Sequence, residues 1–108
     1  MKLWVDDVRP APEDYLWCKS VNEVKEMILF FENVLLTIRP GRKIEIIDID
    51  HDAGDFALDG GDYIKLLDWL EETNRNYPIR IHSMNLVGVA NMRAIIERNG
   101  WTEVRKEI

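Results

Sequence analysis

Three short apolar runs in this chain break abruptly into acids, histidine or serine, and this pattern constrains the fold more than any other feature. The breaks fall in residues 4–10, 48–52 and 80–85. Helical patterns separate them, and alternating strands and helices are typical of a parallel sheet with right-handed crossovers. The carboxyl ends of such strands share one edge of the sheet, and ligands bind outside that edge. We therefore expect the functional residues to lie there.

The apolar periodicity predicts four or five strands and three helices. The strands are expected over residues 2–6, 15–19, 44–50, 79–82 and 101–108, and the helices over residues 21–39, 62–74 and 87–99. Ser20 and Glu23 form a capping box for the first helix, and Gly100 is placed to end the last one. Residues 54–61 are expected to be a loop, and residues 7–19 show no helical pattern.

The strands alternate polar and apolar residues, whereas parallel strands covered on both faces are almost wholly apolar. Lys2 and Trp4 alternate with apolar neighbours, and so do Arg80 and His82. We therefore predict that one face of the sheet is poorly covered. Trp4, Trp17 and Trp101 are candidates to shield it, and a homodimer through this face is a further hypothesis.

Composition excludes several classes of protein. The 108 residues suit a single domain, 1–108, and the net charge of −6 argues against broad binding to duplex nucleic acid. A small phosphate ester in a local pocket stays compatible with that charge. No apolar run approaches the ~20 residues of a membrane span, and the N-terminus lacks an apolar secretory segment. With Cys18 as the single cysteine, a reducing, cytoplasmic location is expected.

The chain resembles the cyclic-phosphate-processing receiver domains, a divergent branch of the response-regulator receiver fold. The resemblance is carried by residues 3–12, by Asp50-His51-Asp52 and the residues up to Asp55, and by residues 81–85. It covers essentially the whole chain. It implies an α/β, receiver-like (flavodoxin-like), mostly parallel sheet of order 2-1-3-4-5 without the first helix. It also implies activity on cyclic phosphates of nucleotides or RNA ends.

The resemblance assigns roles to three acids. In receivers an acidic pair at the end of the first strand helps to hold Mg²⁺, and Asp6 and Asp7 match it. Asp50 matches the position that receivers phosphorylate. A site for Mg²⁺ or another divalent cation at these three residues is therefore expected. In the alternative, Asp6 and Asp7 cap a loop, or one binds while the other orients Arg9.

His51 and His82 are expected at the ends of neighbouring strands, roughly 5 Å apart. Two imidazoles so placed suit acid–base catalysis on a phosphodiester, because the pKa of histidine lies near neutrality. Asp50 would assist them, and Asp52 would hold His51 in one tautomer or cap the loop. The alternative is that one histidine is structural.

Three further residues are candidates to bind phosphate oxygens. Arg9 offers a bidentate guanidinium, with a salt bridge to Asp6 or Asp7 as the alternative. Ser83 matches a hydroxyl that contacts the phosphoryl group in receivers, and it could instead cap a turn. Asn85 is a third candidate, although turn chemistry also favours asparagine.

These residues support three functional hypotheses. The leading one is a phosphoesterase-type enzyme that processes cyclic phosphates. The second is a non-catalytic receiver-like module that senses a ligand or forms a dimer. The third is phosphorelay signalling, which needs a lysine after the last strand. Lys106 is the candidate for that lysine, and the histidine that follows Asp50 argues against this hypothesis.

Overall fold

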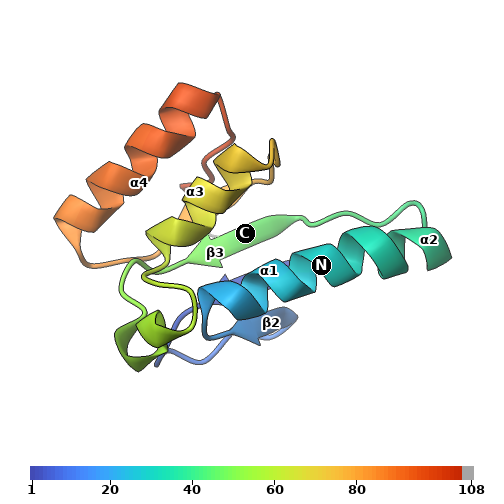
Figure 1. Cartoon of the computed structure of the whole chain (residues 1–108), viewed down its shortest axis with the longest axis horizontal. Coiled ribbons are helices and arrows are strands. Elements are labelled where there is room, and N and C mark those ends of the chain that lie inside the picture. The colour runs from blue at the N-terminus through green and yellow to red at the C-terminus, as the bar shows by residue number, and fades with distance from the viewer. Residues whose placement is uncertain (106–108) are drawn as a thin grey trace.

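A four-stranded, all-parallel sheet forms the centre of the computed structural model, which describes residues 1–105 (Figure 1). The strands are β1 (Lys2–Val5), β2 (Tyr15–Cys18), β3 (Ile46–Ile49) and β4 (Ile79–Ile81). Their order is β2-β1-β3-β4, with each pair parallel. The predicted receiver-like α/β architecture is thereby confirmed.

The helices form where the sequence predicts them, with two local additions. They are α1 (Val21–Phe30), α2 (Leu36–Ile38), α3 (Ile64–Glu72) and α4 (Leu86–Asn99). A π turn, η1 (Phe31–Leu35), joins α1 to α2, and the predicted loop contains a 3-10 turn, η2 (Gly54–Leu58). Among residues 1–105, no helix is both long and apolar enough to cross a membrane.

Capping residues set the helix ends. The Glu23 backbone N–H donates to Ser20 Oγ at 3.1 Å, while the Glu23 carboxylate accepts from the Lys19 N–H at 3.4 Å. At α4, Asn85 Oδ1 accepts from the Gly88 N–H at 2.9 Å. Gly100 then ends α4 in the left-handed region, at φ 66°.

The strand expected over residues 101–108 is reduced to a single parallel bridge, between Ile79 and Glu103, in the part that the structure describes. The Ile79 N–H donates to Thr102 O at 3.0 Å, and the Val104 N–H donates to Ile79 O at 2.7 Å. Lys106, the lysine that a phosphorelay site would require, lies outside the described residues.

The helices lie on one face of the sheet, as Figure 1 shows. Alternate strand residues, including Leu3, Val5, Ile47, Ile49 and Ile79, join the helices in one hydrophobic core. The residues between them form the opposite face, which carries no helix in the described chain. The prediction of a poorly covered face is confirmed in that no helix of the described chain lies on it, while Ile46 and Asp48 of this face are still buried.

The segment over residues 6–14 replaces the missing first helix and is tied back to the sheet by two tryptophans. Trp4 Nε1–H donates to Arg9 O at 2.8 Å, and Trp17 Nε1–H donates to Asp6 O at 2.7 Å. Trp101 does not share this role, because it packs against the core on the helical side.

Candidate functional site

The strand register brings polar residues together at the carboxyl edge of the sheet. Val5 pairs with Ile49, and Ile49 pairs with Ile81. The ladder continues one residue further, since the Asp50 N–H donates to Val5 O at 2.9 Å and the His82 N–H donates to Ile49 O at 3.0 Å. Asp6, Asp50 and His82 therefore lie just beyond three adjacent strands.

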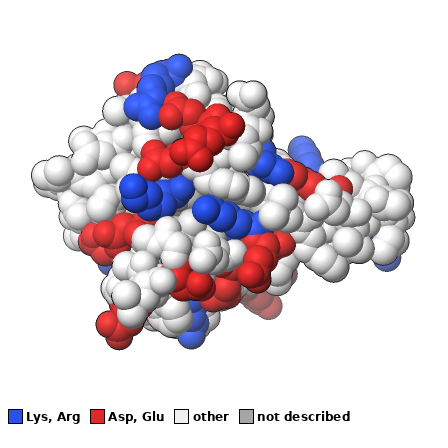
Figure 2. Space-filling view, in the orientation of Figure 1, with Lys and Arg blue, Asp and Glu red and all other residues white. Residues whose placement is uncertain are grey.

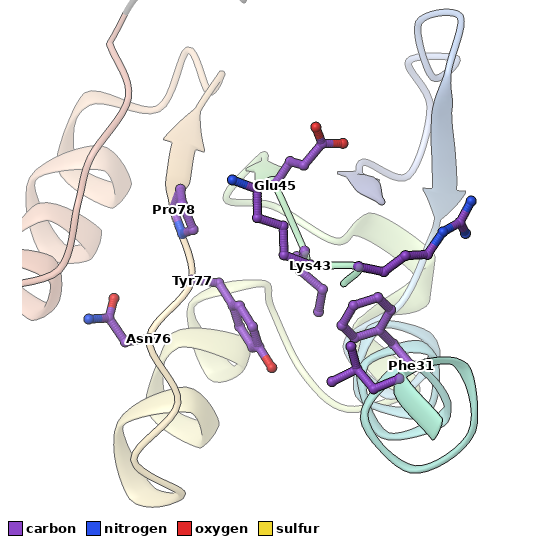
Figure 3. A pocket seen from close by; sticks show the side chains of 9 residues that line it. Phe31, Lys43, Glu45, Asn76, Tyr77 and Pro78 are labelled. Atoms are coloured by element: carbon purple, nitrogen blue, oxygen red, sulfur yellow. The ribbon is translucent and has the colours of Figure 1, made fainter. Parts of the chain in front are cut away.

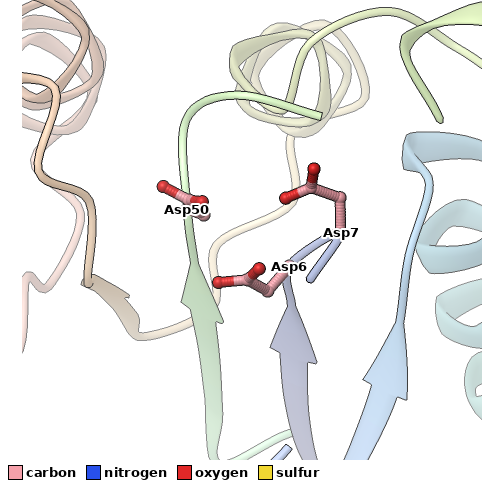
Figure 4. Close-up of side chains that lie close together, drawn as sticks. All are labelled: Asp6, Asp7 and Asp50. Carbon is pink, nitrogen blue, oxygen red and sulfur yellow. The ribbon is translucent and has the colours of Figure 1, made fainter. Parts of the chain in front are cut away.

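The carboxylates of Asp6, Asp7 and Asp50 form an acidic cluster above the ends of β1 and β3 (Figure 4). One oxygen of each lies within 4.8 Å of the others. Asp6 and Asp7 can both approach this point because β1 ends at Val5, so the strand alternation no longer separates them. Carboxylate oxygens at this spacing fit a hard divalent cation.

The two adjacent acids have opposite pKa shifts. Burial, together with the charges of Asp6 and Asp50, raises the pKa of Asp7. Burial would also raise the pKa of Asp6, but hydrogen bonds from the Arg9 and Val8 backbone and from His82 lower it overall. The backbone N–H groups of Arg9 and Val8 donate to Asp6 Oδ1, at 2.8 and 2.9 Å respectively. Asp6 therefore also shapes the turn that follows β1.

His82 is enclosed on the face of the sheet that carries no helix in the described residues. Its Nδ1 lies 2.6 Å from Asp48 Oδ1, and its Nε2 lies 2.9 Å from Asp6 Oδ2. The ring stacks on Trp4, with centroids 3.9 Å apart and planes at 4°, and the side chain is 6% exposed. Each ring nitrogen of His82 therefore lies within hydrogen-bond distance of one buried carboxyl group.

Asp48 completes the buried network around His82, and sequence reasoning missed it. Its second oxygen accepts from Arg80 Nη1 at 3.0 Å, so Asp48 has both His82 and Arg80 as partners. Pairing of this kind offsets the cost of burying charge. The sequence does carry a signal for Asp48. It alternates with Asp50 in the strand predicted over residues 44–50, which places both side chains on the face without helices.

His51 has a different environment from His82. Its Nδ1 lies 2.9 Å from Asp52 Oδ1, with Asn85 Nδ2 at 3.4 Å. The ring packs against the first turn of α4, where a Cβ at Gly88 would lie 2.4 Å from ring carbons. Within residues 1–105, Nε2 has no hydrogen-bond partner, and the side chain is 16% exposed.

The remaining candidates lie around these groups. Arg9 Nη1 donates to His82 O at 3.2 Å and forms no salt bridge with Asp6 or Asp7. Ser83 Oγ accepts from the Asn85 N–H at 3.1 Å, and the Asn85 side chain caps α4. The turn roles considered for Ser83 and Asn85 are thus present, and they leave the Ser83 hydroxyl hydrogen available to donate.

A separate pocket of about 420 Å³ lies at the opposite edge of the sheet (Figure 3). It is lined by Phe31, Leu36, Arg42, Lys43, Ile44, Glu45, Asn76, Tyr77 and Pro78. Its strand-proximal residues precede β3 and β4, so it is remote from the acidic cluster. It contains neither histidine and only one acid, and it is a weaker candidate for catalysis.

An all-parallel sheet of order 2-1-3-4, with an acidic cluster beyond its first and third strands in sequence, defines a receiver-like domain. Residues 1–98 match the family described as the cyclic-phosphate processing receiver domain, and the chain belongs to that family. The resemblance predicted from the sequence is confirmed. Comparisons with curated proteins and with solved structures returned no significant match.

Proposed function

We propose that this domain is a phosphoesterase-type hydrolase that opens the cyclic phosphate of a nucleotide or an RNA end. The observation that carries this proposal is the cluster of Asp6, Asp7 and Asp50 at the same sheet edge as His51, whose ring is held by Asp52. Membership of the cyclic-phosphate processing family supports the class of substrate.

A divalent cation such as Mg²⁺ fits the acidic cluster, because three carboxylate oxygens converge there and the pKa of Asp7 is raised by burial and by its acidic neighbours. Asp6, Asp7 and Asp50 would hold it. When bound, such a cation neutralises negative charge that develops on phosphate oxygens.

His51 is assigned the proton transfer. With Asp52 accepting from Nδ1–H, Nε2 is free to accept a proton from water. The water oxygen forms a bond to phosphorus while the ring P–O ester bond breaks, and the proton passes to the departing alkoxide. The product is a linear phosphate monoester. His82 has both nitrogens engaged by Asp6 and Asp48, so its role is to position Asp6.

Arg9, Ser83 and Asn85 are assigned to substrate binding. The Arg9 guanidinium uses one N–H for His82 O and retains others for phosphate oxygens. The Ser83 hydroxyl can donate to the same group, and the Asn85 amide lies within 3.4 Å of both His51 and Asp52.

Incubation with a nucleoside 2′,3′-cyclic phosphate, with and without Mg²⁺, tests the proposal. A linear monophosphate should form, and His51→Ala and Asp50→Asn should each slow its formation by about 100-fold or more. Asp55→Asn is the matched control, because Asp55 is an exposed acid of η2 outside the cluster. Equal rates for wild type and His51→Ala would reject the enzyme assignment.

A second candidate function is a non-catalytic module that binds a ligand or partner at this edge. Met84 and Leu86, on either side of Asn85, are more than four-fifths exposed, which favours a contact there. Binding of the cyclic nucleotide without turnover would support this function. Labelling by acetyl phosphate that Asp50→Asn abolishes would instead support phosphorelay chemistry.

A further inference from the structure

The pocket whose residues precede β3 and β4 has the size and lining of a site for a small ligand. It holds about 420 Å³, within the range of about 300–1,000 Å³ that is usual for ligand pockets. Phe31 and Ile44, which are 2% and 3% exposed, belong to its lining, and Figure 3 shows the rings of Phe31 and Tyr77 on two sides of it. Two aromatic side chains so placed favour a flat ring between them, because aromatic rings attract one another when they stack with an offset or meet edge to face. We refer to this hollow as the amino-edge pocket.

Hydrogen bonds hold the Tyr77 ring in place before any ligand binds. The Tyr77 hydroxyl donates to Glu32. The same carboxylate accepts from Arg75 Nε at 2.9 Å and from Arg75 Nη2 at 2.7 Å. The Arg75 guanidinium in turn lies 4.5 Å from the centroid of the Trp69 ring. A pocket wall that is fixed in this way reduces the conformational entropy lost when a ligand binds.

Arg42 and Lys43 bring positive charge to the amino-edge pocket. Acids and bases adjoin one another over most of the visible body in Figure 2. Most arginines of the described chain form ion pairs with acids, namely Arg75, Arg80, Arg93, Arg98 and Arg105. Arg42 and Lys43 are exposed lining residues that form no ion pair within residues 1–105. Glu45, the one acid of the lining, already lies 3.3 Å from the Met1 amine. Although the whole chain has a net charge of −6, this pocket is therefore suited to an anion.

We propose that the amino-edge pocket binds a small aromatic carboxylate, with its ring between Phe31 and Tyr77. The Arg42 guanidinium can bind the carboxylate through two parallel N–H donors, and the Lys43 ammonium adds a second positive charge. This site is separate from the acidic cluster, because β3 lies between them and its four residues span about 13 Å at about 3.3 Å per residue. For a ligand of this size we expect a dissociation constant between about 0.1 and about 1 mM.

An NMR titration of the whole chain with 2-naphthoate tests the proposal, and its readout does not depend on turnover at the acidic cluster. The backbone amide resonances of residues 42–45 and 76–77 should shift and reach saturation with the expected dissociation constant, while those of residues 50–52 stay in place. The absence of a saturable shift at the pocket residues up to about 10 mM 2-naphthoate would overturn the proposal.

Two analogues of the probe test which features of the ligand are recognised. The neutral 2-naphthamide has the same shape without the charge, and it should bind about fivefold more weakly or worse. The saturated decahydro-2-naphthoate keeps the charge without the flat ring, and it should bind about 2–10-fold more weakly. Equal affinity for the amide would contradict the anion site, and equal affinity for the saturated acid would contradict the role of Phe31 and Tyr77.

Substitutions of the two cations test the protein side of the same contact. The double variant Arg42→Gln, Lys43→Gln should bind 2-naphthoate about fivefold more weakly or worse, because the carboxylate then meets no positive charge. Both residues are exposed, so the variant is expected to fold, and circular dichroism checks this. Lys65→Gln is the matched control, since Lys65 is an exposed cation of α3 outside the lining, and it should bind as wild type does. A double variant with wild-type affinity would overturn the proposal.

Discussion

His82 and His51 both follow strands at the same sheet edge, but they have different hydrogen-bond partners and we expect different roles for them. His82 lies between two buried acids and stacks on Trp4, so both of its ring nitrogens belong to the hydrogen-bond network of the folded structure. His51 contacts one exposed carboxylate and keeps Nε2 without a partner in the described chain. A buried imidazole with hydrogen bonds at both nitrogens stabilises its surroundings. An imidazole with one free nitrogen can exchange a proton there.

Replacing His82 by leucine should therefore be severely destabilising. The substitution leaves Asp6 and Asp48 buried without their shared hydrogen-bond partner, and breaking a buried pair costs about 3–5 kcal/mol. Urea unfolding gives the measurement. His51→Leu is the matched control, with an expected loss of about 1 kcal/mol or less. Similar losses for the two variants would contradict the structural role of His82.

Gly88 controls the position of the His51 ring. A Cβ at residue 88 would lie 2.4 Å from ring carbons, so Gly88→Ala must displace the imidazole. Stability is a poor measure, because alanine itself favours a helix over glycine by about 1 kcal/mol. The imidazole C–H resonances of His51 should shift in NMR spectra while those of His82 stay in place. Gly41→Ala, where a Cβ would contact nothing within 4 Å, should leave both unchanged.

Asp7 should make stability depend on pH in a direction opposite to the usual one for an acid. Because its pKa is raised by burial and by Asp6 and Asp50, the folded protein binds the Asp7 proton more tightly than the unfolded chain does. Ionised Asp7 therefore destabilises the fold at neutral pH, and this penalty fades as pH falls through the folded pKa.

In the absence of divalent cations, Asp7→Asn should raise the thermal unfolding midpoint at pH 7. The gain should shrink toward pH 4, where wild-type Asp7 takes up its own proton. Asp55→Asn serves as the exposed control and should show no comparable gain. A gain that grows as the pH falls would show that the pKa of Asp7 is not raised.

Among the elements, α1 depends on a cap that also holds the loop before α3. Ser20 Oγ accepts from the Glu23 N–H and donates to Asp59 Oδ2 at 2.6 Å, and Ser20 is fully buried. Ser20→Ala should cost about 1–2 kcal/mol in urea unfolding, because it removes the cap. Thr37→Ala, which removes an exposed hydroxyl bonded within its own helix, should change stability by about 0.5 kcal/mol or less. Equal effects would mean that the cap contributes little.

Elements with local signals could be predicted from the sequence. The Ser20 cap, Gly100 and the apolar periodicity fix the helices to within a few residues, because each signal acts on its immediate neighbours. The π turn at Phe31–Leu35 and the 3-10 turn at Gly54–Leu58 could not be predicted, since the packing of distant residues selects them. The strand expected after Gly100 forms only one bridge in the described chain. The alternation of polar and apolar residues there could not show how short the pairing is.

In the candidate site, too, some features follow from the chain's topology and others depend on the packing of distant residues. The gathering of Asp6 and Asp50 at one edge follows from the parallel topology alone. The partnership of His82 with Asp48 depends on which face each side chain occupies and on the register between β3 and β4. A one-residue change in register would move either side chain to the other face. The location of the site was therefore predictable, and its hydrogen bonds were not.

On the scale of the whole molecule, negative charge is concentrated at the carboxyl edge of the sheet. The chain carries a net charge of −6, and three of its acids meet at the carboxyl edge. Asp6 has His82 as a partner, whereas Asp7 and Asp50 make no salt bridge within the described residues. A cation that binds only the folded protein would relieve this repulsion and stabilise the whole domain by mass action.

Mg²⁺ should therefore raise the unfolding midpoint of the intact domain. For a dissociation constant of about 1 mM, about 10 mM Mg²⁺ adds about 1.4 kcal/mol. For a domain of this size that is a shift of roughly 5–10 °C. NaCl at matched ionic strength separates specific binding from screening, because screening acts on every exposed charge alike.

Asp50→Asn should lose most of the Mg²⁺-dependent shift, since it removes one of the three converging ligands, while Asp55→Asn should keep it. Scanning calorimetry measures both without reference to any substrate, so cation binding is separated from turnover. If NaCl gives the same shift, or if Asp50→Asn retains the full Mg²⁺ effect, the carboxylates do not act together as a cation site.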